Sequence, residues 1–252
     1  MRAARYLQAL LLPVIAGVAF EIYARRVAAN SDTLAPLSRA ASALWASALD
    51  GSLWQATGFT LTAAALGLVV GGGLGLLFGI VLGLSRRSAD AAFLSIEVLR
   101  PVPSVAIIPL AMLVFGFGYA LEISVVAFAC FWPIMLLAQA AVRQIEPKLL
   151  EVAHVLGFTG GERVWKFVLP AIVPRLFVAL RLGVAIALVV AVTVELAANP
   201  HGLGYGLILA QQSLRPELMI GWLVWIAVLG FLVNVGAEVL QQWVARRMGA
   251  VQ

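Results

Sequence analysis

Few ionisable side chains lie inside the long apolar stretches of this sequence, and they are the first candidates for chemistry. Burying a charge in hydrocarbon is costly, so a charged residue in such a stretch has a functional role or a partner. An arginine that faces a cavity of low dielectric constant attracts anions. A path for a small anion across a membrane is therefore the chemistry that these stretches suggest. The candidate path residues are Arg100, Ser104, Ile107, Arg181 and Glu195.

Each charged candidate also has a simpler explanation. Arg100 can pair with Glu97, which lies three residues earlier on the same helix face. Arg181 can extend its side chain to the membrane surface instead of lining a polar path. Glu195 lies near the end of its apolar stretch, where the interface or a neighbouring helix could satisfy it.

Several classes of function find no support in the residue pattern. Ser104 lies between prolines without an obvious base, so we expect no catalytic residue. His154 and His201 lie in predicted loops without a Cys, His or Asp cluster, so we expect no metal site and no cofactor. The sequence has no phosphate-binding Gly-Lys-Ser/Thr loop, which means that any ATP hydrolysis belongs to another chain.

The composition places these residues in a membrane protein. Apolar residues make up 63% of the 252 residues, charged residues make up 12%, and the mean hydropathy is +1.02. Long apolar runs without alternation predict an all-α integral membrane protein rather than a barrel. The length leaves room for about six spans of roughly 20 residues each. We expect them near residues 7–24, 56–84, 98–117, 120–142, 171–197 and 218–243.

Three of these spans have features that predict their packing. Glycines recur every fourth residue from Gly67 to Gly83, and small residues recur in the same way from Ala179 to Ala191. Such faces let a neighbouring helix backbone approach closely. Pro101, Pro103 and Pro109 predict that the span at 98–117 is irregular and faces protein or water rather than lipid.

The distribution of basic residues predicts the orientation in the membrane. With the amino terminus inside, eleven lysines and arginines lie on the inner side and four on the outer side. Both termini and the loop 143–170 are then cytoplasmic, although Arg25 and Arg26 fall outside. A cleaved signal peptide would also fit Arg2 and Arg5 before an apolar run, but we favour an uncleaved first span. The net charge of +5 reflects this topology and contact with anionic lipid, not nucleic acid.

The loop 143–170 is the most polar part of the chain. Its first half predicts a short helix with Val152, Val155 and Leu156 on one face and a stop at Gly157. A short amphipathic helix outside the bilayer can place its apolar face in a groove of another protein. The loop is therefore a candidate docking element.

The same loop resembles the EAA loop of ABC importer permeases. Five residues match that pattern in register: Glu151, Ala153, Gly157, Leu169 and Pro170. Val152 and Phe167 depart from it. LRPVPSVAIIPL at 99–110 and Glu195-Leu196-Ala197-Ala198 followed by Gly202-Leu203-Gly204-Tyr205 resemble the nitrate, sulfonate and taurine branch. The resemblance covers roughly residues 55–245.

The resemblance implies a fold, a function and a set of partners. The fold would be the type I ABC importer permease fold in one domain, residues 1–252, in the bacterial cytoplasmic membrane. The partners would be a second copy of the chain, two cytoplasmic ATPase subunits and an extracytoplasmic binding protein. The coupling residues would be Glu151, Val152, Ala153, His154, Val155, Leu156 and Gly157.

The cargo implied by the branch is a small anion such as a sulfonate, a nitrate or a carboxylate. Two alternatives from other classes remain open, namely a secondary transporter or channel that works without an ATPase, and a scaffold subunit without its own path. The scarcity of ionisable residues at the middle of the spans argues against a secondary transporter.

Overall fold

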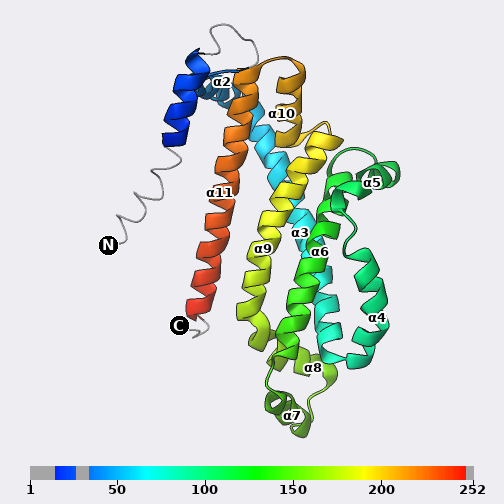
Figure 1. Ribbon diagram of the computed structural model, residues 1–252. Helices are drawn as coiled ribbons and strands as arrows, with labels where there is room; N and C mark the ends of the chain where they lie inside the picture. Colours follow the sequence, from blue (N-terminus) through cyan, green and yellow to red (C-terminus); the bar gives the residue numbers. More distant parts are fainter. Residues whose placement is uncertain (1–14, 27–33, 248–252) are drawn as a thin grey trace. The chain divides into compact units, whose positions relative to one another are not determined.

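The computed structural model describes residues 15–26 and 34–247, and helices dominate this part of the chain (Figure 1). Residues 15–26 form one helix. The elements that follow are α2 (Leu37–Leu49), α3 (Ser52–Leu84), α4 (Arg86–Leu99), the 3₁₀ helix η1 (Ser104–Ile107), α5 (Ile108–Phe115), α6 (Tyr119–Arg143), α7 (Pro147–Val155), α8 (Gly160–Arg163), the π-helical segment η2 (Val164–Val168), α9 (Leu169–Ala197), α10 (Gly202–Gln212) and α11 (Pro216–Arg247).

The chain forms two compact units. The first comprises Met1–Phe59 and His201–Leu229. The second comprises Thr60–Pro200 and Gly230–Gln252 and contains all five candidate path residues and the candidate coupling residues 151–157.

The predicted membrane spans are largely confirmed. In the described part of the chain, four helical stretches are long and apolar enough to cross a membrane: Ser52–Leu84, Tyr119–Arg143, Gly160–Gln212 and Pro216–Val244. They match the second, fourth, fifth and sixth predicted spans. The fifth stretch contains α9 (Leu169–Ala197), which agrees with the predicted 171–197, and extends beyond it at both ends. The helix at 15–26 overlaps the first predicted span, of which residues 7–14 lie outside the described residues.

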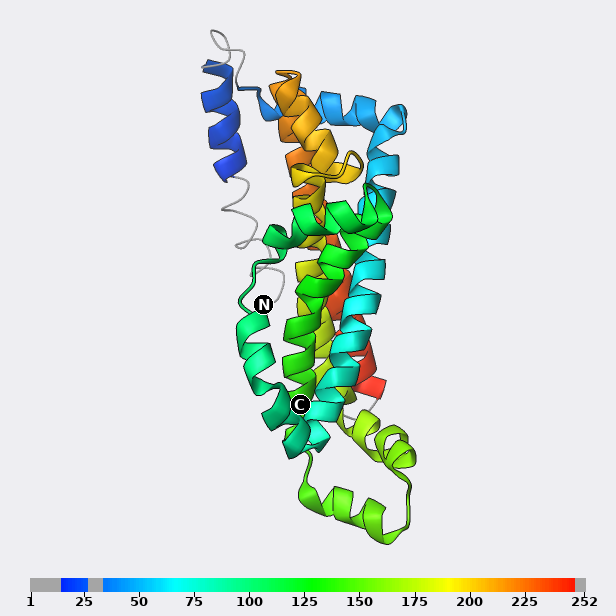
Figure 2. The same ribbon diagram turned by 90° about the vertical axis from the view of Figure 1, so that its right-hand side faces the viewer.

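The third predicted span needs correction. Instead of one helix over 98–117, α4 ends at Leu99 and η1 begins at Ser104, and the two helical parts are bent by 81°. Figure 2 shows α4 running beside α6 and α5 turning across it. The break falls at Pro101 and Pro103, which have no backbone N–H for a helical hydrogen bond. The predicted irregularity is therefore confirmed, but the segment starts at Arg86 and turns sharply at its middle.

The glycine series of α3 packs against α6, as predicted. A Cβ atom added at Gly75 would lie 2.6 Å from the carbonyl oxygen of Phe131, and one at Gly79 would lie 2.5 Å from that of Met135. A Cβ atom at Gly71 would collide with the backbone of Ala127. The absence of side chains on this face lets the two helix backbones touch, which is how small residues hold membrane helices together.

The small-residue series of α9 is also buried. Ala179, Ala187 and Ala191 are at most 2% exposed. A Cβ atom at Gly183 would lie 2.8 Å from Leu68 of α3 and 3.0 Å from Ile134 of α6. The helices α3, α6 and α9 therefore form the tightly packed centre of the second unit.

The first unit departs from local propensity at one place. Three closely spaced glycines, Gly202, Gly204 and Gly206, favour a non-helical turn, yet all three lie within the bounds of α10. A Cβ atom at Gly206 would lie 2.9 Å from the indole ring of Trp222, so this glycine serves a close helix contact. Packing against a large aromatic ring outweighs the low helix propensity of glycine here.

Candidate functional site

The predicted docking helix exists and is longer than expected. It begins at Pro147, where a proline at the first helical position costs no hydrogen bond, and it ends at Val155. Gly157 has a φ angle of +74°, and the backbone N–H of Phe158 donates to the carbonyl oxygen of Ala153 at 3.2 Å. This is a Schellman stop, in which the left-handed residue is almost always glycine. The structure therefore confirms the stop predicted at Gly157.

The apolar side of α7 faces solvent. Val152 is 50% exposed, Val155 84% and Leu156 63%, and the carboxylate-bearing Glu151 is exposed beside them. Ala153 is instead fully buried and fixes the helix to the rest of the loop. His154 lies in α7, and its side chain is outside the described part of the structure. Three neighbouring aliphatic side chains thus form an exposed apolar surface, which is a common feature of protein-binding sites.

The second half of the loop holds this helix in place. Thr159 and Glu162 form a capping box that starts the continuous helical stretch through α8, η2 and α9. The ring of Phe158 lies 5.2 Å from that of Phe167, and Lys166 lies 4.7 Å from the centre of the Phe158 ring. Figure 1 shows α7 and α8 beyond the ends of α6 and α9, where the loop stands free of the helix bundle.

Arg100 and Ser104, two of the candidate path residues, line the same hollow. The hollow measures about 360 Å³, and its other walls come from α6 and α9, including Trp132 and Val190. Arg100 also lies 3.8 Å from Glu97, so the alternative role as a surface pair is present as well. The arginine side chain is about half exposed and can reach both the hollow and Glu97.

The other candidate path residues are placed differently. Ile107 packs against the apolar core beside Leu121 and Val125. Arg181 donates to Glu238 at 3.2 Å and to Asn234 at 3.5 Å, which ties α9 to α11. Arg181 is therefore neither extended to the membrane surface nor free, and its partners were not predicted for it.

Glu195 does not face an open path in this structure. It is 2% exposed, and its Oε1 accepts a hydrogen bond of 2.6 Å from the hydroxyl of Thr60 in α3. Close to it lies Glu122, fully buried near the start of α6, which the sequence analysis overlooked. A scan of the apolar stretch 120–142 for acidic residues would have found Glu122, because charge inside a span is unusual.

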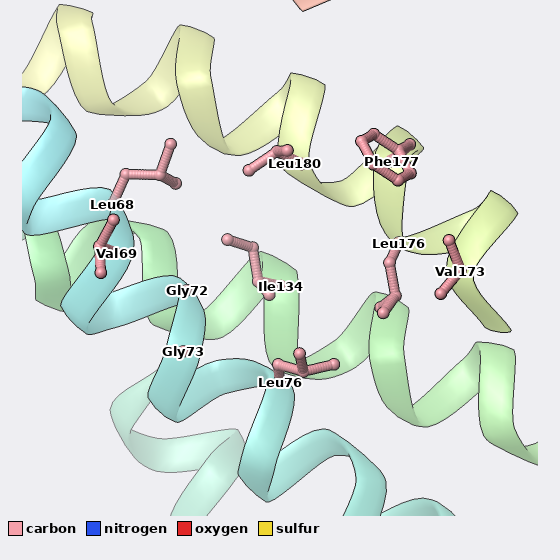
Figure 3. Close-up of a pocket in the computed structure, with 10 residues that line it drawn as sticks. All are labelled: Leu68, Val69, Gly72, Gly73, Leu76, Ile134, Val173, Leu176, Phe177 and Leu180. Atoms are coloured by element: carbon pink, nitrogen blue, oxygen red, sulfur yellow. The ribbon is translucent and has the colours of Figure 1, made fainter. Parts of the chain in front are cut away.

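A second hollow is purely apolar. It measures about 430 Å³ and lies between α3 and α9 with Ile134 of α6 as its floor (Figure 3). Leucines and valines point into it, and Gly72 and Gly73 leave room on the α3 side. Nothing among its ten lining residues could bind a charge, so the hollow beside Arg100 is the better candidate for an anion.

The sequence matches one protein family over most of its length. Residues 71–250 match the model of the binding-protein-dependent transport system inner membrane component. A putative aliphatic sulfonates transport permease protein, SsuC of Bacillus subtilis (strain 168), is 33% identical over 194 residues, which are 77% of this chain and 70% of that protein. The taurine transport system permease protein TauC of Escherichia coli (strain K12) is 30% identical over 204 residues, 81% of this chain and 74% of that protein.

Less similar relatives and solved structures are also components of transport systems. The nitrate import permease protein NrtB of Synechocystis sp. (strain ATCC 27184 / PCC 6803 / Kazusa) is 27% identical over 69% of this chain and 64% of that protein. A chain of an amino acid ABC transporter crystallised with histidines superposes with a TM-score of 0.63 and 19% identity, covering 81% of this chain and 97% of that chain. A chain of the inward-facing MetNI methionine ABC transporter superposes with a TM-score of 0.60 and 19% identity over 77% of this chain and 94% of that chain. The fold is that of a type I ABC importer permease.

Proposed function

Because the chain belongs to the family of binding-protein-dependent transport system inner membrane components, and is thus a permease subunit rather than an enzyme, we propose that the solute it imports is a small anion. Its relatives are named for sulfonates, taurine, bicarbonate and nitrate, all of which carry an oxyanion group. The family membership implies an ATPase and a substrate-binding protein as partners. It also sets aside the alternative of a secondary transporter or channel that works alone.

The exposed helix α7 is the coupling element, and its geometry is the observation that carries this proposal. Val152, Val155 and Leu156 form an apolar face that has no cover within the described residues, and Glu151 adds a charge beside it. The coupling segment also contains Ala153, His154 and Gly157, and Gly157 ends the helix. This face would enter a groove of the ATPase in the way that amphipathic helices bind partner proteins.

The path for the anion passes the hollow beside Arg100 and Ser104. The guanidinium group offers several N–H donors and the serine a hydroxyl group, which together suit the oxygens of a sulfonate or a nitrate. Ile107 belongs to the same irregular segment. Arg181 and Glu195 enter the path only if their present contacts open during transport.

Alternating access then needs two bodies that move against each other around the path. We assign the whole chain, residues 1–252, to one permease domain with lipid around it, and we pair it with a second copy on a two-fold axis. Both termini and the loop 143–170 lie in the cytoplasm. Arg86 at the start of α4, Arg143 at the end of α6 and the loop lysines Lys148 and Lys166 support this orientation, because cytoplasmic ends of membrane proteins are rich in basic residues.

Charge placed on the apolar face of α7 tests the coupling role. Val155→Asp and Glu151→Lys should reduce both the recovery of the ATPase with the purified permease and the transport rate by about 10-fold, which corresponds to about 1.4 kcal/mol of binding free energy. Gly161→Asp is the matched control, because it adds charge to the same loop at a site with nothing within 4 Å.

The measurement is the ratio of ATPase to permease after affinity purification, together with uptake into proteoliposomes. Normal recovery and uptake with Val155→Asp would rule out α7 as the coupling element. An equal loss with Gly161→Asp would show that any charge in the loop disrupts it, and would also count against the specific role of α7.

A further inference from the structure

Four polar side chains meet inside the second unit, at the end of the bundle opposite α7. They are Thr60 from α3, Glu122 from the first turn of α6, Glu195 from the last turn of α9 and Asn199 from the turn that follows α9. All four are at most 2% exposed. Polar groups this deeply buried must satisfy one another, because the free energy lost with an unpaired buried polar atom is large.

The hydrogen bonds account for three of these side chains. Thr60 donates to Glu195 Oε1 at 2.6 Å, and Asn199 Nδ2 donates to Glu122 Oε2 at 2.9 Å. Asn199 Oδ1 in turn accepts the backbone N–H of Gly118 at 3.0 Å. Across the described residues, no donor reaches Glu122 Oε1, although this atom is shielded from solvent.

The carboxyl group of Glu195 is close enough to the carboxyl group of Glu122 to interact with it electrostatically. Two ionised carboxylates side by side in a buried site repel each other strongly. A hydrogen atom held between them would remove the repulsion and would also give Glu122 Oε1 the donor that it lacks. One bound proton therefore resolves both problems at once.

Within the described residues, the helices that carry the site have no lysine or arginine near it. Neither α3 nor α5 contains a titratable residue. On α6, Arg143 lies 21 residues after Glu122, or about 31 Å along the helix, and on α9 Arg181 lies 14 residues before Glu195, or about 21 Å. Tyr119 is 43% exposed, and the ring of His201 stacks on that of Phe59 with 5.1 Å between the ring centres.

We propose that Glu122 and Glu195 form a proton-binding site that holds one hydrogen between the two carboxyl groups and so ties the start of α6 to the end of α9. The site also includes Thr60 and Asn199, which orient the two carboxyl groups. It joins three helices of the packed centre at one end of the unit. This inference does not depend on the solute or on the ATPase contact proposed above.

Infrared spectroscopy of the full-length chain tests the bound proton directly. A protonated carboxyl group has a C=O stretching band that neither a carboxylate nor an amide shows. At neutral pH the parent protein should show this band, and Glu122→Gln/Glu195→Gln should lack it. Glu97→Gln is the matched control and should leave the band unchanged, because Glu97 is half exposed and lies beside Arg100.

Thermal stability supplies a second readout. A glutamine can donate the hydrogen bond that the proton provides, so Glu122→Gln or Glu195→Gln alone should keep Tm within about 2 °C of the parent. Glu122→Ala removes the 2.9 Å acceptor of Asn199 Nδ2, leaves it only the longer bond of 3.4 Å to the carbonyl oxygen of Gly118, and should lower Tm by more than about 4 °C.

Three results would overturn the proposal. One is an identical infrared spectrum for the parent and the double glutamine variant. Another is a single glutamine variant that loses as much stability as Glu122→Ala. The last is a parent protein without the band whose Tm rises when choline chloride is replaced by sodium or potassium chloride, since a metal cation would then occupy the site.

Discussion

At the scale of single residues, the close contacts of glycine decide how tightly the membrane helices pack. The face from Gly67 to Gly83 touches the backbone of α6, whereas Gly73, on the same helix, has open space where its Cβ atom would be. Gly73 and Gly75, only two positions apart, therefore differ in whether they can accept a side chain: Gly73 can and Gly75 cannot. The reason is geometric, because a backbone contact cannot yield in the way that a flexible side chain can.

Gly75→Leu should therefore destabilise the folded protein by about 1–3 kcal/mol or more, because the new side chain forces α3 and α6 apart. The measurement is the yield of monodisperse protein in detergent and its Tm. Gly73→Leu is the control and should behave nearly like the parent. Equal yields for the two variants would contradict the packing of α3 on α6.

Several polar side chains inside the membrane spans are paired with side chains on neighbouring helices. Arg181, Glu238 and Asn234 satisfy one another across α9 and α11, and Thr60 satisfies Glu195. A charged residue in a span is thus not evidence of a path by itself, because a partner on another helix explains it equally well. Of the charged candidates, Arg100 is the one that lines a hollow.

At the scale of elements, the break between α4 and η1 exposes residues that a straight helix would present to lipid. Arg100 and Ser104 border the hollow of about 360 Å³, whereas Ile108, at the start of α5, is 4% exposed and packs in the core. The bend of 81° separates these two environments within a few residues.

Cysteine labelling should report this difference. In a Cys130→Ala background, single cysteines at 100 and 104 should react with a water-soluble thiol reagent, and the rate should change when ATP is added to the assembled transporter. A cysteine at 108 is the buried control and should stay unreactive. Inert cysteines at both 100 and 104 in each state would mean that this segment does not border the path.

At the scale of the whole molecule, the described part of the chain contains the membrane helices of a single permease subunit and the helix α7 that we propose as its coupling element. ABC importers enclose their path between two permease subunits, and a homodimer on a two-fold axis needs no second gene product. Each α7 would then contact one ATPase subunit. We expect the purified transporter to contain two copies of this chain and two ATPase subunits.

Native mass spectrometry of the complex in mild detergent measures this stoichiometry. A mass that corresponds to two permease and two ATPase chains would support the homodimer. A complex that contains a second, different permease chain, or a single copy of this one, would contradict it. The tags should be placed on the ATPase so that permease copies are counted without bias.

Much of this protein is determined by the sequence alone. The apolar runs fixed four long helices, and Gly157 fixed the end of α7, because both depend on neighbouring residues along the chain. The glycine series likewise indicated a packing face, since its period places the residues on one side of a helix. The family motifs belong to the same group of local signals.

Tertiary structure decided what depends on residues far apart in the sequence. Glu122 and Asn199 are 77 positions apart, and Thr60 and Glu195 are 135 apart, so no periodicity could indicate that they share one buried site. The direction of α5 after the proline break could not be predicted from the sequence either, because prolines end a helix without determining the direction of the chain that follows. Gly206 lies in α10 against the indole ring of Trp222, a contact between two helices that local propensity does not indicate.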